Sequence, residues 1–211
     1  MTTDPDSGGR LEAIVLAAGS GARFGGGKLT EPFQVGVLIE GALACAFAAP
    51  VRSVFLTVGG DPDAASAAHR FADQIGGRAR LRIVEVADHA EGMGASLRAA
   101  ARALPEDAEG VFVFLGDMPF VPARILPSLA AALAAGALAA VPICGGRRGH
   151  PALFSAAVIP RLARLEGDAG ARVILADMGA ELSLVETEDD GVLLDIDSPA
   201  DLQRLTGRSM V

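Results

Sequence analysis

A glycine-rich loop near the start of the chain has the composition of an anion-binding site. A short apolar run leads to Gly19, and the loop that follows holds further glycines, Arg23 and a terminal Lys28. Backbone N–H groups approach an anion closely where glycines replace larger residues, and fixed cations then neutralise its charge. We therefore expect this loop to cradle phosphate groups. The alternative is a glycine-rich turn that ends in a solvated lysine.

Two well-known phosphate-binding loops do not match this segment. The dinucleotide fingerprint needs a third glycine where this chain has Phe24. The Walker loop needs a glycine where the chain has Ala22, and a serine or threonine where it has Leu29. The loop is therefore expected to hold nucleotide phosphates in a third way.

Two acidic segments supply candidate metal ligands. Asp117 follows the apolar run Val111–Leu115, and Asp195 and Asp197 share one face if their segment is extended. These carboxylates suit Mg²⁺, which takes few protein carboxylates and completes its shell with substrate phosphates and water. The alternative is capping, by Asp117 of a turn or helix and by Asp197 or Ser198 of the last helix. Capping and metal binding are compatible, so both interpretations stay open.

Polar residues beside glycines provide three further candidates. The segment Gly92–Ser96 opens a helix and suits contacts with a base, a ribose or an anion, although Ser96 or Gly94 can equally be a simple N-cap. His150 can donate to a phosphate or help to position an acceptor. Arg172 and the pair Arg147 and Arg148 can clamp an anionic acceptor. A structural histidine and a solvated surface arginine are the alternatives.

The elements that must position these residues alternate along the chain. Apolar runs of strand length are expected at Ala13–Ala17, Ser53–Val58, Leu81–Val86, Val111–Leu115 and Leu138–Pro142. Between them, helices are expected at Val37–Ala48, Asp61–Ile75, Gly94–Leu104 and Pro122–Ala134, the second with Asp61 as N-cap. This alternation predicts a Rossmann-like, mostly parallel sheet with helices on both faces. Ligands then bind beyond the carboxyl ends of the strands, where the candidate residues fall.

The pattern changes after Val141. A glycine–arginine loop leads to His150, and the elements expected after it are an extended Pro151–Phe154, helices at Ala156–Leu165 and Ala169–Met178, and strands at Leu182–Val185 and Val192–Leu194. A last helix is expected to start at Ser198. Residues 1–10 are expected to form a disordered tail, and residues 11–207 a single domain.

Composition excludes several classes of function. The chain has 211 residues and a net charge of −8 without a basic block, which argues against non-specific nucleic-acid binding. Its apolar stretches are broken well before about 18 residues, so no membrane-spanning helix is expected. Cys45 and Cys144 have no metal-type spacing and are expected to be small core residues of a cytoplasmic protein.

Six motifs in one order resemble the molybdenum-cofactor nucleotidyltransferases, within the wider nucleotide-diphospho-sugar transferase superfamily. They are Leu16–Lys28, Glu91–Leu97, Gly116–Pro119, Gly149–Pro151, Gly167–Arg172 and Asp195–Leu202. The resemblance spans about Leu11 to Leu205. It implies a Rossmann-like α/β fold and a Mg²⁺-dependent reaction, in which an acceptor oxygen attacks the α-phosphorus of a nucleoside triphosphate and pyrophosphate leaves.

The resemblance also implies a role for each candidate residue. Arg23 and Lys28 would hold the triphosphate and stabilise charge in the transition state, and Asp117, with Asp197 and Asp195, would hold Mg²⁺. The nucleotide site would comprise Ala17, Ala18, Gly19, Gly21, Gly25, Lys28, Gly92 and Ser96. The acceptor site would comprise His150, Asp168 and Arg172.

The Ala17-Ala18-Gly19 sequence resembles the cytidylyl-transferring branch, which implies CTP as donor and molybdopterin as acceptor. Glu31 stands in a segment where relatives carry a basic residue, so another phosphorylated acceptor is an alternative, as is GTP. A further class is a NAD(P)H-dependent oxidoreductase, against which Phe24 argues. The last alternative is a non-catalytic chaperone that delivers cofactor to a molybdenum hydroxylase, against which Lys28 and Asp117 argue.

Overall fold

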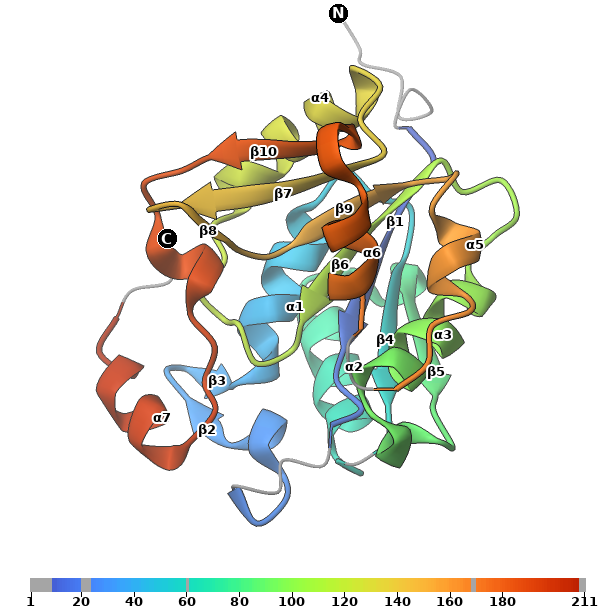
Figure 1. Ribbon diagram of the computed structural model, residues 1–211. Coiled ribbons are helices and arrows are strands. Elements are labelled where there is room, and N and C mark those ends of the chain that lie inside the picture. Colours follow the sequence, from blue (N-terminus) through green and yellow to red (C-terminus); the bar gives the residue numbers. More distant parts are fainter. Residues whose placement is uncertain (1–8, 20–23, 60, 168–169, 209–211) are drawn as a thin grey trace, which may run out of the picture.

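The centre of the molecule is an eight-stranded sheet (Figure 1). The computed structural model describes residues 9–19, 24–59, 61–167 and 170–208. In spatial order the strands are β10 (Leu182–Glu186), β7 (Ala139–Cys144), β9 (Ala152–Ser155), β6 (Gly110–Leu115), β1 (Leu11–Leu16), β4 (Val54–Val58) and β5 (Leu81–Glu85). The short β8 (Arg147–Arg148) pairs with the end of β7. A separate hairpin is formed by β2 (Pro32–Phe33) and β3 (Gly36–Val37).

The sheet is mostly parallel, as the alternation of apolar runs and helices predicts. β1 lies between β4 and β6 and is parallel to both, with Ile14 opposite Phe55 and Val113. These three strands are buried almost throughout, because helices cover both of their faces. The exceptions are the short β8, which is antiparallel to β7, and β9, which is antiparallel to β6 and β7 and lies between them.

Helices cover the two faces of the sheet and bury a separate apolar cluster on each (Figure 1). One cluster takes side chains from α1 (Ile39–Ala48), α2 (Ala64–Gln74), α4 (Leu126–Ala134) and α7 (Pro199–Leu205). The other takes them from α3 (Met93–Ala103), α5 (Ile159–Leu162) and α6 (Arg172–Asp177). Short 3-10 turns are η3 (Lys28–Thr30), η4 (Arg78–Arg80), η5 (His89–Glu91), η6 (Ala123–Ile125), η7 (Gly179–Glu181) and η8 (Asp190–Leu193). In the part of the chain that the structure describes, none of the helices combines the length and the apolar content needed to cross a bilayer.

Several expected elements are shorter than the sequence suggests, and one is wrong. The expected strand at Val192–Leu194 is wrong, because η8 occupies this segment and begins where Asp189 accepts the Gly191 N–H. Asp61 is not the N-cap of α2, which begins at Ala64. Its carboxylate instead accepts the N–H of Asp63 and the hydroxyl of Thr30.

The remaining helix boundaries differ for local reasons. α1 begins at Ile39 because Val37 pairs with Pro32 in the hairpin. The helices expected at Ala156–Leu165 and Ala169–Met178 shorten to α5 and α6.

Two further expectations concern the N-terminal tail and the cysteines. Residues 1–8 of the expected tail lie outside the described residues. Cys45 is buried, whereas Cys144 is only half-buried, so the core role expected for both cysteines holds for Cys45 alone.

At the amino ends of the central strands, charged side chains pair with one another. The buried carboxylate of Glu12 accepts hydrogen bonds from Arg52 Nε at 2.8 Å and from the Ser53 N–H at 3.0 Å. Arg52 also pairs with Asp107 at 2.8 Å. Burial raises the pKa of Glu12 above its ordinary value, and the Arg52 contacts oppose that rise. Nearby, Arg10 pairs with Glu109 at 2.6 Å.

Candidate active site

Lys28 joins the two acidic segments at the carboxyl end of the sheet. Its ammonium donates to Asp117 Oδ2 at 2.8 Å and to Asp197 Oδ1 at 3.1 Å. The lysine side chain is only 12% exposed and that of Asp117 26% exposed, so solvent screens this ion pair weakly. Lys28 and Asp197, which lie 169 positions apart in the chain, therefore meet at this edge of the sheet.

The backbone explains how Asp197 reaches Asp117. The N–H of Ile196 donates to the Asp117 carbonyl at 3.0 Å, which holds the Asp195–Asp197 segment against the loop after β6. α7 then starts at once, because Ser198 accepts the Asp201 N–H and Pro199 occupies the first helical turn. Ser198, and not Asp197, is therefore the N-cap of α7, and the Asp197 carboxylate contacts Lys28.

The oxygen donors of this cluster fit a magnesium ion that is shared with a phosphate. Asp117 and Asp197 place two carboxylates against one positive charge, and burial raises the pKa of nearby Asp195 above its ordinary value. Within the described ranges, no three His, Cys, Asp or Glu side chains gather closely enough to hold a metal by themselves. Mg²⁺ commonly needs only one or two protein carboxylates, because substrate phosphates and water supply its other ligands.

Thr57 fixes the start of the glycine-rich loop. Its hydroxyl, fully buried in β4, accepts the Ala17 N–H at 3.0 Å and lies 3.4 Å from the Val15 carbonyl, to which it donates. Ala17 and Ala18 are themselves only 2% exposed. Sequence reasoning missed Thr57, although one hydroxyl inside a fully buried apolar strand is a recognisable signal, because a buried hydroxyl needs partners.

The loop itself is described only in part. Gly21 and Arg23 lie outside the described residues, and so does the acceptor candidate Asp168. The end of the loop is described: Gly25, Gly26 and Gly27 all have positive φ angles, of 76°, 102° and 65°. Larger residues rarely adopt this backbone conformation, so the glycines are required here. The Thr30 N–H donates to the Gly27 carbonyl and anchors the chain just as Lys28 begins η3.

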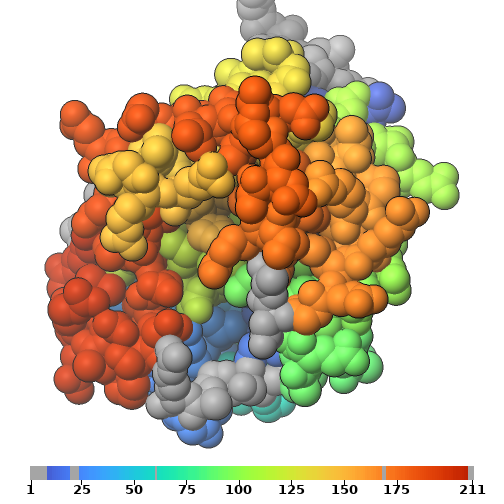
Figure 2. All heavy atoms as spheres, in the orientation of Figure 1, coloured from blue at the N-terminus to red at the C-terminus, as the bar shows by residue number. Residues whose placement is uncertain are grey.

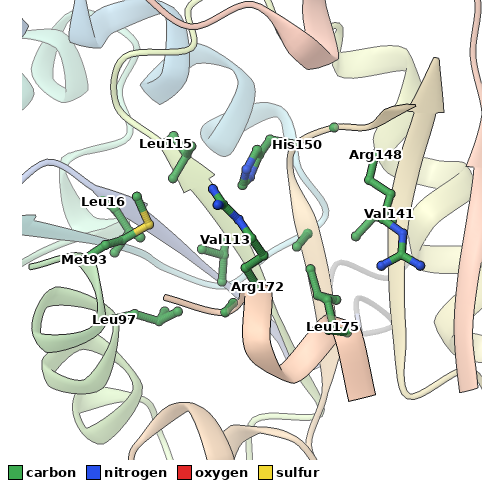
Figure 3. Close-up of a pocket in the computed structure, with 14 residues that line it drawn as sticks. Leu16, Met93, Leu97, Val113, Leu115, Val141, Arg148, His150, Arg172 and Leu175 are labelled. Carbon is green, nitrogen blue, oxygen red and sulfur yellow. The ribbon is translucent and has the colours of Figure 1, made fainter. Parts of the chain in front are cut away.

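A cavity of about 370 Å³ opens beside this cluster (Figure 3). Its walls are mostly apolar and come from the ends of β1, β6 and β7 and from α3 and α6. The lining residues are Leu16, Met93, Leu97, Val113, Leu115, Val141, Arg148, Gly149, His150, Ala152, Ala171, Arg172, Leu175 and Ala176. In the space-filling view the surface is hollowed between the C-terminal segment and the segment around residues 150–180 (Figure 2).

Three basic side chains face this cavity. Arg172 extends from the start of α6 toward His150, and Arg148 lies on the β7 side (Figure 3). Burial lowers the pKa of His150, so the imidazole is neutral at pH 7. Its pKa is also affected by the negative charge of Asp117, a hydrogen bond to the Val113 carbonyl and the positive charge of Arg172. The buried Nδ1 atom of His150 has no hydrogen-bond partner among the described residues.

The Gly92–Ser96 and Gly167–Arg172 motifs lie against each other. The Gly94 N–H donates to the Gly167 carbonyl at 2.9 Å, and a Cβ on Gly94 would come within 2.3 Å of that oxygen. This approach requires glycine. α3 begins at Met93, so Ser96 is a buried residue inside the helix and is not its N-cap.

The structure thus brings the predicted residues together in two adjacent groups. Lys28, Asp117 and Asp197 form the first, and His150 and Arg172 form the second at the cavity. Ala17, Ala18, Gly19, Gly25, Gly92 and Ser96 do not line the cavity. Their neighbours Leu16, Met93 and Leu97 line it instead, and these belong to the predicted motifs without having been assigned to the site individually.

Comparisons with known proteins identify the family of this chain. The MobA-like NTP transferase domain matches residues 13–183. Nicotine blue oxidoreductase from Paenarthrobacter nicotinovorans is 29% identical over 206 residues, covering 92% of this chain and 96% of that protein. Molybdenum cofactor cytidylyltransferase from Escherichia coli K12 is 26% identical over 191 residues, covering 90% and 93%.

Solved structures extend the likeness to the fold. Rv0371c from Mycobacterium tuberculosis H37Rv is 30% identical, with 95% of this chain and 98% of that chain covered and a TM-score of 0.77. The crystal structure of its complex with manganese has a TM-score of 0.75 at 28% identity, with 95% and 100% covered. Because the domain match covers most of its length, this chain belongs to the MobA-like NTP transferase family, a family of nucleotidyltransferases.

Proposed function

We propose that this protein transfers CMP from CTP to molybdopterin in a Mg²⁺-dependent reaction and releases pyrophosphate. The observation that carries the proposal is the meeting of Lys28, Asp117 and Asp197 beside a basic, mostly apolar cavity. Triphosphate and metal would bind at the first group, and the acceptor in the cavity. The reaction would then take place at their border.

The chemistry needs positioning and charge rather than a covalent nucleophile. A phosphate oxygen of the acceptor forms a bond to the α-phosphorus of CTP, and the bond from that phosphorus to the bridging oxygen of the β-phosphate breaks. Lys28 stabilises the negative charge that accumulates on the phosphates, and Arg23 would assist from the glycine-rich loop. Fixed cations of this kind act strongly in a site from which water is largely excluded.

A bound Mg²⁺ would neutralise phosphate charge and orient the triphosphate. Asp117 and Asp197 would hold it, and their two carboxylates suit the few protein ligands that this ion takes. Asp195 is the third candidate, and burial raises its pKa above the ordinary value. Rv0371c, a relative of this chain, has been crystallised in complex with manganese, which supports a divalent ion in the family.

The cavity fits an acceptor that joins an apolar or planar body to an anionic group. Leucine, valine and alanine side chains form most of its walls, while Arg148 and Arg172 supply positive charge. Guanidinium groups bind phosphate through paired N–H donors. A phosphate on the acceptor would therefore be held by Arg172, on the side where the neutral His150 also lies.

The choice of CTP rests on the Ala17-Ala18-Gly19 sequence and on the cytidylyltransferase among the relatives. The test is a melting-temperature series with CTP, GTP, ATP and NADPH, each with and without Mg²⁺. A ligand at about 100 times its Kd stabilises the folded protein by about 2.7 kcal/mol, which shifts the melting temperature clearly. A CTP-selective shift that increases with Mg²⁺ is expected.

The same series separates the alternatives. A larger shift with GTP would keep nucleotidyl transfer and change the donor. A shift with NADPH alone would contradict the proposal and favour an oxidoreductase, the activity for which one relative is named. A shift with CTP but no pyrophosphate release when molybdopterin is added would keep the donor and change the acceptor.

A further inference from the structure

Lys28 is bonded to the same two carboxylates that would hold the metal. Its ammonium lies 2.8 Å from Asp117 Oδ2 and 3.1 Å from Asp197 Oδ1. One side chain therefore contacts both acidic segments at once.

We infer that Lys28 and a divalent cation compete for Asp117 and Asp197, so that the metal enters this site together with the triphosphate, which draws the Lys28 ammonium away. This inference rests on the proposed function, because the metal is part of that proposal. It assigns Lys28 a second role: besides binding phosphate, Lys28 keeps free divalent ions from occupying the carboxylates.

Electrostatics make joint occupancy unfavourable. An ammonium within hydrogen-bond distance of both carboxylates would stand a few ångströms from a doubly charged ion bound to the same oxygens, and their repulsion falls only slowly with distance. The lysine side chain is 12% exposed, so salt and water screen that repulsion little. The two cations therefore exclude each other unless further negative charge arrives.

A triphosphate supplies that charge and gives the ammonium a new partner. Lys28 directly follows three glycines with positive φ angles, which form the loop expected to cradle phosphates. The hydrogen bond from the Thr30 N–H to the Gly27 carbonyl anchors the backbone at Lys28. The Lys28 ammonium can therefore leave the carboxylates for the triphosphate by rotation of its flexible four-carbon side chain alone. Leu29, buried next to it, keeps the backbone in place.

The test measures Mn²⁺ binding without any nucleotide, by the loss of the free-ion electron paramagnetic resonance signal. Wild-type protein is compared with Lys28→Met, which keeps the length of the side chain and removes its charge. We expect Lys28→Met to bind Mn²⁺ at least about tenfold more tightly, a change that corresponds to about 1.4 kcal/mol. Lys28→Arg is the matched control that keeps the charge, and it should bind Mn²⁺ as weakly as wild type.

A double variant locates the ion. Lys28→Met combined with Asp117→Asn should lose the added affinity if the ion binds at these carboxylates. Equal Mn²⁺ affinity in wild type and Lys28→Met would overturn the inference, and so would added affinity that persists in the double variant. If circular dichroism shows that Lys28→Met is unfolded, Lys28→Gln serves as the neutral variant.

Failure of this inference is distinguishable from failure of the proposed function. A Mg²⁺-dependent CTP shift without added Mn²⁺ affinity in Lys28→Met would remove the competition and leave cytidylyl transfer standing. Added Mn²⁺ affinity in a protein that binds no nucleotide would establish the competition and remove the transferase proposal.

Discussion

The two ends of the central sheet both gather charged side chains, but they use them differently. At the amino ends, Arg52 lies between Glu12 and Asp107, and the Glu12 carboxylate also accepts a backbone N–H. At the carboxyl ends, Lys28 lies between Asp117 and Asp197, next to a cavity of about 370 Å³. Each end therefore contains one cation between two carboxylates, and at the carboxyl end the cavity-lining Leu115 comes two residues before Asp117.

The difference separates stability from function. The charges of the amino-end network are held by one another and by the backbone, so its contribution is to the folded state. Asp117 of the carboxyl-end group is close enough to His150 to affect its pKa, and the buried Nδ1 of that histidine has no hydrogen-bond partner among the described residues. We therefore propose that this group receives a ligand. Parallel sheets bind ligands at this end because their loops converge there. A variant at the amino end that loses turnover but not stability would contradict this division, and so would a variant at the carboxyl end that loses stability but not turnover.

The largest effect is expected for Asp117→Ala. Loss of this carboxylate removes a proposed metal ligand and a partner of Lys28, and single electrostatic contacts of this kind are worth about 100- to 1,000-fold in rate. We expect pyrophosphate release to fall by at least about 100-fold while the circular dichroism spectrum is unchanged. Asp107→Ala at the amino end is the matched control and should retain full turnover. Equal losses in both variants would remove the distinction between the ends.

The next effect is expected for Arg52→Met, which leaves the buried Glu12 carboxylate with only its backbone partner. Hydrogen bonds to charged groups are worth about 1.5 to 3 kcal/mol, and a buried charge without its partner costs more. We expect the free energy of unfolding to fall by about 2 kcal/mol at pH 7.5 while turnover is retained. Urea denaturation measures the first quantity and pyrophosphate release the second.

The loss in Arg52→Met should depend on pH. The Arg52 contacts lower the pKa of Glu12 because they favour the ionised carboxylate, whereas burial raises it. The stabilisation that Arg52 provides through Glu12 is therefore present above the raised pKa of Glu12, and it is lost as the pH falls through that value, because the carboxyl is then protonated with or without Arg52. A deficit that is equally large at pH 7.5 and pH 4 would contradict this assignment.

A smaller, more selective effect is expected for Arg172→Ala. Removal of one guanidinium that binds a phosphate costs about 1.5 to 3 kcal/mol, or about 10- to 100-fold in affinity. We expect KM for the acceptor to rise by that factor, while KM for CTP stays within about twofold. Steady-state kinetics with each substrate varied in turn tests this. Arg161→Ala, in an exposed ion pair with Asp177, is the control and should leave both constants unchanged.

The smallest effect is expected for Arg10→Ala at the amino end. Its ion pair with Glu109 is about half exposed on both sides. Exposed pairs contribute about 0.2 to 1 kcal/mol, because water screens them and two side chains must be ordered. We expect a loss in unfolding free energy within that range and unchanged turnover. A loss above 2 kcal/mol would show that the amino-end network acts as one cooperative unit.

Much of the fold and part of the site follow from sequence. The continuous apolar runs at β1, β4 and β6 identify buried parallel strands, and the position of Asp117 after β6 places it at the ligand-binding edge. The strand expected at Val192–Leu194 failed because a short apolar run has no clear period, and the turn at Asp189 decides the local structure.

Other features depend on tertiary contacts that no local pattern contains. The hydrogen bond between Gly94 and Gly167 joins two motifs separated by 73 positions, next to Met93, which lines the cavity. The antiparallel β9 between two parallel neighbours is another such feature, since its sequence is that of any buried strand. The contact of Lys28 with both Asp117 and Asp197 is a third such feature, because the sequence does not show which of the acids the ammonium reaches.

The most direct measurement follows α-phosphorus-labelled CTP in a reaction with molybdopterin and Mg²⁺, with pyrophosphate measured in the same tube. We predict that label enters molybdopterin and that one pyrophosphate appears for each label transferred, with both signals lost in Asp117→Ala and kept in Asp107→Ala. Bound CTP with neither transferred label nor pyrophosphate in the wild-type protein would contradict cytidylyl transfer to molybdopterin at the carboxyl end of this sheet.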